Sequence, residues 1–278
     1  MPRPLAARIL SVLTLLVLVP VASADPTPGK QTAEHYDPAD GSPGLGYLLY
    51  LPADYGKDPA KRWPVMLFLH GSGEAGNGTT QLDKVKVHGP PKVVGRDKDF
   101  PFVLISPQNP APVRPEGASR PAGSVATTPA TRPAARRGGW NPQQLKGLLD
   151  TVLANQAKQA DPDRVYLTGL SMGGFGSWAM AAMYPDTFAA VAPICGGGDP
   201  ASADKIKHLP IWVFHGEKDP TVPIARSEAM VTALKATGAK DVQFTRYPDA
   251  GHDSWTVTYD NPRLYAWFLS HSRSVGGK

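Results

Sequence analysis

Ser171 is the central residue of a Gly-x-Ser-x-Gly pattern at residues 169–173, between an apolar run at Val165–Thr168 and a helix-like sequence. A serine between a strand and a helix is typical of a nucleophile elbow, a sharp turn that exposes the hydroxyl group. Gly169 and Gly173 lack side chains that would keep the strand and the helix apart. The following helix directs free amide groups and its positive dipole end at the serine. The pattern therefore predicts a nucleophilic serine of the kind that serine hydrolases use.

Serine hydrolysis also needs a base to take the serine proton and an acidic residue to orient that base. In one well-known arrangement, the three residues follow one another in the chain as serine, acid and histidine. Asp219 lies in the loop after an apolar strand, and His252 lies in a glycine-flanked loop after the next strand. We therefore expect Asp219 and His252 to complete a triad with Ser171.

Four nearby residues offer alternatives to this assignment. Glu217 lies in the same loop as Asp219 and is the rival acid, whereas Asp253 adjoins the histidine too closely to orient it easily. His215 ends a strand, where a packed, hydrogen-bonded histidine is expected. His271 lies in the pattern of the last helix, where we expect a solvated surface residue.

An acyl-transfer site also needs amide groups that stabilise the oxyanion. One donor is expected to be the backbone amide of Met172, directly after the nucleophile, and the second that of Ser72 in the glycine-rich loop after an early strand. No metal ion or organic cofactor is expected. The glycines at 71–78 lack the Gly-Lys-Ser/Thr ending of a phosphate-binding loop, and no histidine–cysteine cluster has zinc spacing.

Apolar, β-branched runs alternate with helix-like patterns along the chain, which predicts a mainly parallel sheet with helices on both faces, an α/β fold. Pro142, Pro223 and Pro262 each suit the first turn of a helix. The expected strands are Gly46–Leu51, Pro64–His70, Phe102–Ser106, Val165–Thr168, Ala190–Ile194, Ile211–His215 and Val242–Tyr247. The expected helices are Pro142–Ala157, Ser171–Met183, Pro223–Thr237 and Pro262–His271.

The first 24 residues have the pattern of a signal peptide: two arginines, an apolar core and a small-residue cleavage site. We expect export to the periplasm or the extracellular medium, with no membrane association after cleavage and one catalytic domain at 25–278. Cleavage would remove two arginines and lower the formal net charge from +5 to +3, which indicates no nucleic-acid partner. Cys195 is the single cysteine of the chain, so no internal disulfide is expected, and its apolar surroundings favour a buried structural thiol. The sequence does not indicate the oligomeric state.

Residues 109–139 interrupt the alternation with a segment rich in proline, alanine and arginine. Such a segment cannot bury enough apolar surface to offset its ordering entropy, so we expect a largely disordered insertion, either a passive loop or a basic flap. It separates Gln108 from Trp140, and both residues are expected near the pocket. Trp255, three residues after the histidine, is a further possible substrate contact.

Four motifs together resemble the exported α/β-hydrolases often labelled "predicted peptidases", a group similar to feruloyl and acetyl-xylan esterases and polyhydroxybutyrate-depolymerase-like enzymes. The motifs are the His-Gly-Ser-Gly-Glu sequence at 70–74, the serine pattern at 169–174, the segment 215–223 and the Ala-Gly-His-Asp sequence at 250–253. The resemblance runs from about residue 45 to about residue 272 and implies an α/β-hydrolase fold. It does not identify the substrate.

The combined expectation is a secreted serine carboxylesterase that forms an acyl-enzyme at Ser171. The expected substrate is an ester, plausibly an acylated polysaccharide or a small aromatic or short-chain ester. Two other kinds of enzyme would use the same catalytic residues. One is a polyester depolymerase, and the other is a serine peptidase of prolyl-oligopeptidase type, although the chain is too short for the propeller domain that such peptidases carry. A binding module with an inactive triad is the non-enzymatic alternative.

Overall fold

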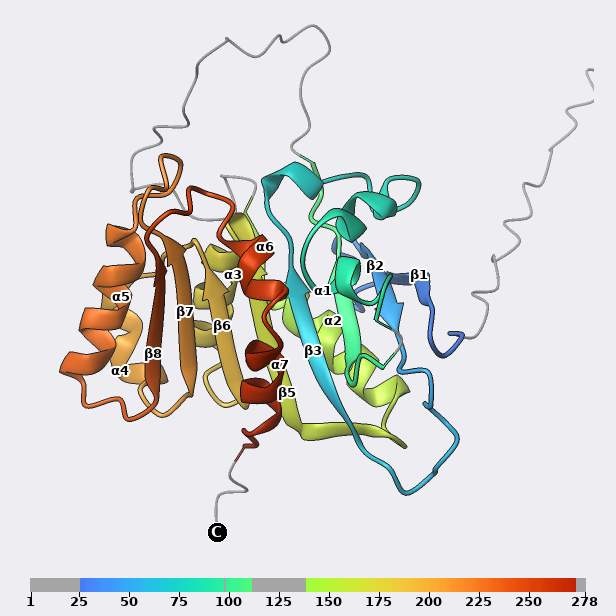
Figure 1. Ribbon diagram of the computed structural model, residues 1–278. Helices are drawn as coiled ribbons and strands as arrows, with labels where there is room; N and C mark the ends of the chain where they lie inside the picture. Colours follow the sequence, from blue (N-terminus) through green and yellow to red (C-terminus); the bar gives the residue numbers. More distant parts are fainter. Residues whose placement is uncertain (1–25, 98, 112–138, 274–278) are drawn as a thin grey trace, which may run out of the picture.

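A computed structural model describes residues 26–97, 99–111 and 139–273. One sheet of eight strands runs through the described part, in the spatial order β1-β2-β4-β3-β5-β6-β7-β8 (Figure 1). The strands from β4 to β8 are parallel, whereas β1 and β2 pair antiparallel at one edge. The strand bounds are β1 Gln31–Tyr36, β2 Leu45–Tyr50, β3 Trp63–Leu69, β4 Val103–Pro107, β5 Ala160–Leu170, β6 Ala190–Ile194, β7 Ile211–Gly216 and β8 Val242–Tyr247.

Helices cover both faces of the sheet (Figure 1). One face carries α2 (Pro142–Asn155), α3 (Met172–Met183), α4 (Ala203–Ile206) and α5 (Ala225–Ala236). The other carries α1 (Gly89–Val93), α6 (Trp255–Tyr259), α7 (Pro262–Leu269) and the 3-10 helix η2 (Leu82–Val87). Because central strands are buried on both faces, they are continuous apolar runs rather than alternating ones.

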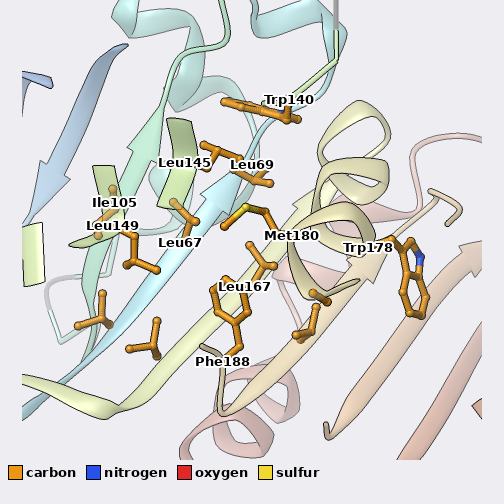
Figure 2. Packing of buried hydrophobic residues seen from close by; sticks show 14 of the residues in the cluster. Leu67, Leu69, Ile105, Trp140, Leu145, Leu149, Leu167, Trp178, Met180 and Phe188 are labelled. Atoms are coloured by element: carbon orange, nitrogen blue, oxygen red, sulfur yellow. The ribbon is translucent and has the colours of Figure 1, made fainter. Parts of the chain in front are cut away.

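Each face of the sheet has its own apolar core, and successive residues of β3 point alternately into the two. Leu67 and Leu69 pack with Leu145 and Leu149 of α2 and Met180 of α3, and all five are buried (Figure 2). This packing fixes the direction of β3 and the position of α3, and these two elements carry the loops of the site. The predicted α/β architecture with helices on both faces is confirmed.

The main differences from the expected elements lie at edges and in short helices. β1 was not expected because its sequence is largely polar, and its residues are only partly buried. β5 begins at Ala160, five residues earlier than predicted, because its first residue pairs with Trp63. Helix α5 begins two residues after Pro223, whereas α2 and α7 do begin at proline, each capped by the preceding asparagine side chain. The 3-10 helices η1 (Ser72–Glu74) and η4 (Pro200–Ser202) complete the description.

His271 is not the solvated surface residue that was expected. Its ring is largely buried, with Nε2 at 2.9 Å from an Asp241 carboxylate oxygen and Nδ1 at 2.7 Å from the Trp267 carbonyl. The expected leader at 1–24 and most of the expected insertion at 109–139 lie outside the described residues. Within the described part, no helix is both long and apolar enough to span a bilayer.

Candidate active site

Ser171 lies on the turn between β5 and α3 with φ 52° and ψ −114°, a conformation that L-residues rarely adopt. Its amide donates a hydrogen bond to the Ile194 carbonyl at 3.0 Å, which holds the turn against the end of β6. A Cβ atom at Gly173 would lie 1.9 Å from the Leu69 carbonyl oxygen, and one at Gly169 would lie 2.5 Å from the Gly173 oxygen. The two glycines are therefore steric requirements of the turn, as the sequence pattern predicted.

The structure brings Ser171, His252 and Asp219 into one hydrogen-bonded array. The His252 Nε2 atom lies 2.9 Å from the serine Oγ, and Nδ1 lies 2.7 Å from Oδ2 of the aspartate. A carboxylate only accepts, so Nδ1 carries the proton and Nε2 can accept the proton of the serine hydroxyl. Glu217 and Asp253 do not take the place of the aspartate: Glu217 lies near Arg246, and the Asp253 carboxylate accepts bonds from Thr256.

The Asp219 side chain is fully buried, yet each of its oxygens is bonded. Oδ1 accepts hydrogen bonds from the amides of Thr221 at 2.8 Å and Val222 at 2.9 Å. Burial alone raises the pKa of a carboxyl group, but the hydrogen bonds from His252 and these two amides outweigh it, and the pKa of Asp219 lies below its ordinary value of 3.8. The carboxylate is therefore ionised at neutral pH.

The loops that carry Asp219 and His252 are joined through their backbones. The Glu217 amide donates to the Tyr247 carbonyl and the Lys218 amide donates to the Ala250 carbonyl, both at 3.0 Å. A Cβ atom at Gly216 would lie 2.2 Å from the Gly251 carbonyl oxygen, so only glycine permits this approach. Asp219 and His252 therefore share one structural unit at the end of β7 and β8.

The loop after β3, residues 70–76, is named here the β3 loop. It lies beside the serine turn because β3 pairs with β5, with Leu69 opposite Gly169. Ser72 is the first residue of η1 and Met172 is the first residue of α3. The first amides of a helix have no intrahelical acceptor, so both predicted oxyanion donors are at helix starts, where their N–H groups are available.

His70 anchors the β3 loop from below and is completely buried. Its Nε2 accepts a hydrogen bond from the Asn109 amide at 2.9 Å, and its Nδ1 donates to the Gly71 carbonyl at 2.5 Å. A backbone amide can only donate, so Nε2 is unprotonated and the ring is neutral. Burial lowers the pKa of His70 to about 4, in agreement with this tautomer.

Gln108 and Trp140, two of the predicted substrate contacts, are buried supports of the β3 loop. The Gln108 amide group donates to the carbonyls of Glu74 and Gln81 and accepts from the Gly78 amide. Trp140 donates to the His70 carbonyl at 3.3 Å, and its ring meets the His70 ring edge-on. Direct contact of either residue with a substrate stays a prediction.

Trp255, the third predicted contact, lies directly against His252. Its ring meets the His252 ring edge-on with 5.2 Å between centroids, and the centroid of the His88 ring lies 5.4 Å from that of Trp255. The Trp255 Nε1 atom is buried with no hydrogen-bond partner among the described residues. The tryptophan therefore packs against the edge of the imidazole and restricts its movement.

Two residues near the array were not assigned to the site from the sequence. His215 is packed and hydrogen-bonded, as expected, but its Nε2 also lies 3.2 Å from Oδ2 of Asp219. Cys195 is completely buried, as expected, and has a positive φ of 41°. No signal in the sequence reveals either contact, because each depends on how neighbouring strands end beside one another.

Cys195 also bears on metal binding, because its sulfur lies within 4.8 Å of donor atoms of Asp219 and His252. These two donors are already hydrogen-bonded at 2.7 Å, whereas two ligands of one tetrahedral zinc ion keep about 3.3 Å between them. Burial also raises the pKa of the Cys195 thiol to about 12, so the thiolate that a metal prefers is disfavoured. The geometry is that of directly hydrogen-bonded side chains.

Comparison with known proteins gives relatives named as esterases and depolymerases. The chain is 29% identical over 170 residues to acetylxylan esterase A of Emericella nidulans, which covers 60% of this chain and 46% of the relative. It is 26% identical over 229 residues to poly(3-hydroxyoctanoate) depolymerase of Pseudomonas fluorescens, which covers 78% and 77%. The crystal structure of a thermostable esterase matches with a TM-score of 0.66 and 31% identity, over 87% of this chain and 63% of that one. The chain thus spans less than two thirds of the length of the first and third of these proteins.

These matches confirm the expected resemblance to esterases and the α/β-hydrolase fold. The model of the dienelactone hydrolase family matches residues 123–262, which is half of the chain. The chain therefore belongs to the dienelactone hydrolase family.

Proposed function

We propose that this protein is a serine carboxylesterase that hydrolyses esters through an acyl-enzyme at Ser171. The observation that carries the proposal is the continuous array from the Ser171 hydroxyl through His252 to the buried carboxylate of Asp219. A strained serine at the start of a helix, with a neutral imidazole at hydrogen-bond distance, is the arrangement that nucleophilic catalysis requires.

In the proposed mechanism, His252 takes the hydroxyl proton through Nε2 while the Ser171 Oγ attacks the ester carbonyl. The amides of Ser72 and Met172 donate to the oxyanion, and the carboxylate of Asp219 stabilises the imidazolium. The imidazolium then protonates the departing alcohol. Water, deprotonated by the same imidazole, attacks the acyl-enzyme and releases the acid.

The substrate class is proposed from the relatives and not from the geometry. Acetylated polysaccharide follows from the acetylxylan esterase, and a polyester of hydroxy acids follows from the depolymerase that aligns with 78% of this chain. We also propose that residues 1–24 are a cleaved leader and that the mature chain is exported. N-terminal sequencing of the protein from the producing cells would test this part.

The experiment is turnover of an ester panel by the wild type and by Ser171→Ala. The panel holds short and long p-nitrophenyl esters, methyl ferulate, acetylated xylan, a polyhydroxyalkanoate suspension and a chromogenic prolyl peptide. A matched control is Ser202→Ala, because that serine lies in η4 and donates only to the Asp199 carbonyl. We expect ester turnover and fluorophosphonate labelling in the wild type and the control but not in Ser171→Ala. Peptide turnover alone would make the protein a peptidase, and turnover that survives the Ser171 substitution would overturn the proposed nucleophile.

A further inference from the structure

His215 is the last residue but one of β7, and its side chain is completely buried. Its Nε2 atom lies 3.2 Å from Oδ2 of Asp219, the same oxygen that His252 Nδ1 reaches at 2.7 Å. The aspartate therefore lies between two imidazole rings, one that contacts the serine and one that does not. The mechanism above leaves the second ring without a role.

The surroundings of His215 fix which of its nitrogens carries a proton. Nε2 lies 2.9 Å from the Val222 carbonyl oxygen and 3.2 Å from the carboxylate, and both groups only accept. Nε2 is therefore protonated, and it donates to the Val222 carbonyl. Asp219 Oδ2 lies 3.2 Å from the same nitrogen as a close polar contact, beside the hydrogen bonds that the carboxylate accepts from two amides on Oδ1 and from His252 on Oδ2.

Ser227 of α5 holds the other side of the ring. Its Oγ lies 2.8 Å from His215 Nδ1 and 3.1 Å from the Gly196 carbonyl oxygen. With a neutral ring the hydroxyl donates to Nδ1, and with a protonated ring Nδ1–H donates to Oγ, which then donates to the Gly196 carbonyl. The ring keeps the same orientation in both states, so a helix and two strand ends fix its position.

We propose that His215 is a positioning residue, which holds Oδ2 of Asp219 in line with His252 and shares the carboxylate charge with it. This inference rests on the proposed function. Two amides hold Oδ1 and His252 holds Oδ2. The Nε2 atom of His215 lies 3.2 Å from Oδ2, so its N–H dipole adds an electrostatic contact that favours this position of the carboxylate.

The other ionisable groups near Asp219 do not supply this contact. The Cys195 thiol stays protonated because burial raises its pKa to about 12. Lys218 pairs with Asp249 at the surface, and the Asp253 carboxylate is bonded to Thr256. Among the described residues, His215 and His252 are the two imidazole rings that lie within 3.2 Å of Oδ2.

The test uses the full chain with His215→Leu, which removes the N–H, and His215→Gln, whose amide nitrogen can reach the position of Nε2. His271→Gln is the matched control, because it disrupts a partly exposed histidine–aspartate contact outside the array. The first readout is kcat, KM and the pH profile of kcat/KM on the best p-nitrophenyl ester. The second is NMR titration of the His252 ring, which needs no substrate.

We expect His215→Leu to lower kcat about 10- to 100-fold with KM within about 2-fold, because a small misplacement of the relay is costly. Without the His215 contact, the Asp219 carboxylate would interact more strongly with a protonated His252 ring. The acid limb of kcat/KM and the His252 titration midpoint should therefore both move upward by about half a pH unit or more. His215→Gln should restore most of both effects, and His271→Gln should show neither.

Unchanged kcat and an unchanged His252 titration in folded His215→Leu would overturn the proposal. A loss of melting temperature with an unmoved titration midpoint would also overturn it, because that result marks a purely structural residue. If His215→Leu does not fold, the test uses His215→Gln and Ser227→Ala. The Ser227 substitution removes the hydrogen bond to the His215 ring and should shift the His252 titration midpoint in the same direction by a smaller amount. If the wild type lacks Ser171-dependent turnover, the proposed function fails, but the NMR titration still decides the role of His215.

Discussion

His70 should make the stability of this protein sensitive to acid, because burial lowers the pKa of its ring. The folded protein requires the neutral ring, because Nε2 accepts from the Asn109 amide and Nδ1 donates to the Gly71 carbonyl. The pKa of His70 is about 4 in the folded protein, against an ordinary value of 6.5. Between these values the unfolded chain binds the proton and the folded protein does not, so the free energy of unfolding falls as the pH falls.

One pKa unit corresponds to about 1.4 kcal/mol, so the full effect of His70 is about 3 kcal/mol, reached below about pH 4. At pH 4.5 about 2.5 kcal/mol of it should already be lost. Total stabilities of single domains are about 5–15 kcal/mol, so this one ring would decide much of the acid limit of the fold.

The assay is urea unfolding at pH 7.5 and pH 4.5 for the wild type and for His70→Gln, whose side chain can still accept from Asn109 without titrating. For each protein we compare the free energy of unfolding at pH 7.5 with that at pH 4.5. The pH-independent destabilisation caused by the substitution cancels in this difference. We expect the wild type to lose about 2–3 kcal/mol more than His70→Gln, and the exposed control His208→Gln to lose as much as the wild type. Equal losses in wild type and His70→Gln would refute the assignment of a buried, neutral ring.

Three further predictions concern the site. Gly173→Ala should lower the melting temperature by at least about 5 °C and abolish fluorophosphonate labelling, because the new Cβ would lie 1.9 Å from a backbone oxygen of β3. The control Gly73→Ala should leave the melting temperature unchanged, because no atom lies within 4 Å of its Cβ position. Trp255→Ala should lower kcat/KM about 10-fold by removing the edge contact with the base, and Trp255→Phe should lower it less than about 3-fold; equal effects in steady-state kinetics would exclude a role for the ring. Cys195 should not react with a thiol reagent at pH 8 in the native protein and should react once per chain in guanidinium chloride; rapid native reaction would contradict its burial.

The sequence predicted the central part of this structure well because the same residues carry several signals there. The apolar runs of β6 and β8 have the bounds that were expected. The array could be anticipated because Ser171, Asp219 and His252 each lie in the turn or loop after a strand, and parallel strands bring their carboxyl ends to one edge of the sheet.

The rest depends on tertiary contacts that no local pattern encodes. β1 is a half-exposed edge strand whose polar residues gain their conformation from pairing with β2. Trp140 is buried because Gly176 leaves room for its ring beside α3, where a Cβ would lie 2.7 Å from the indole. The contact of His215 with Asp219 depends on the orientation of the His215 ring, which a hydrogen bond with Ser227 of α5 fixes.

The order of strands in the sheet also sets which part of the array opens first. β8 is the last strand, paired only with β7, and its residues are half-buried or exposed, whereas the serine turn lies between β3 and β6 in the interior. Opening free energies are lowest where few buried apolar contacts hold the backbone, so an edge strand frays well before the centre unfolds. Ser171 therefore belongs to the interior of the sheet, whereas His252 follows an edge strand. If His252 is the proton acceptor proposed above, warming below the global transition should inactivate the protein while the serine turn stays folded, and activity should return on cooling as β8 pairs again.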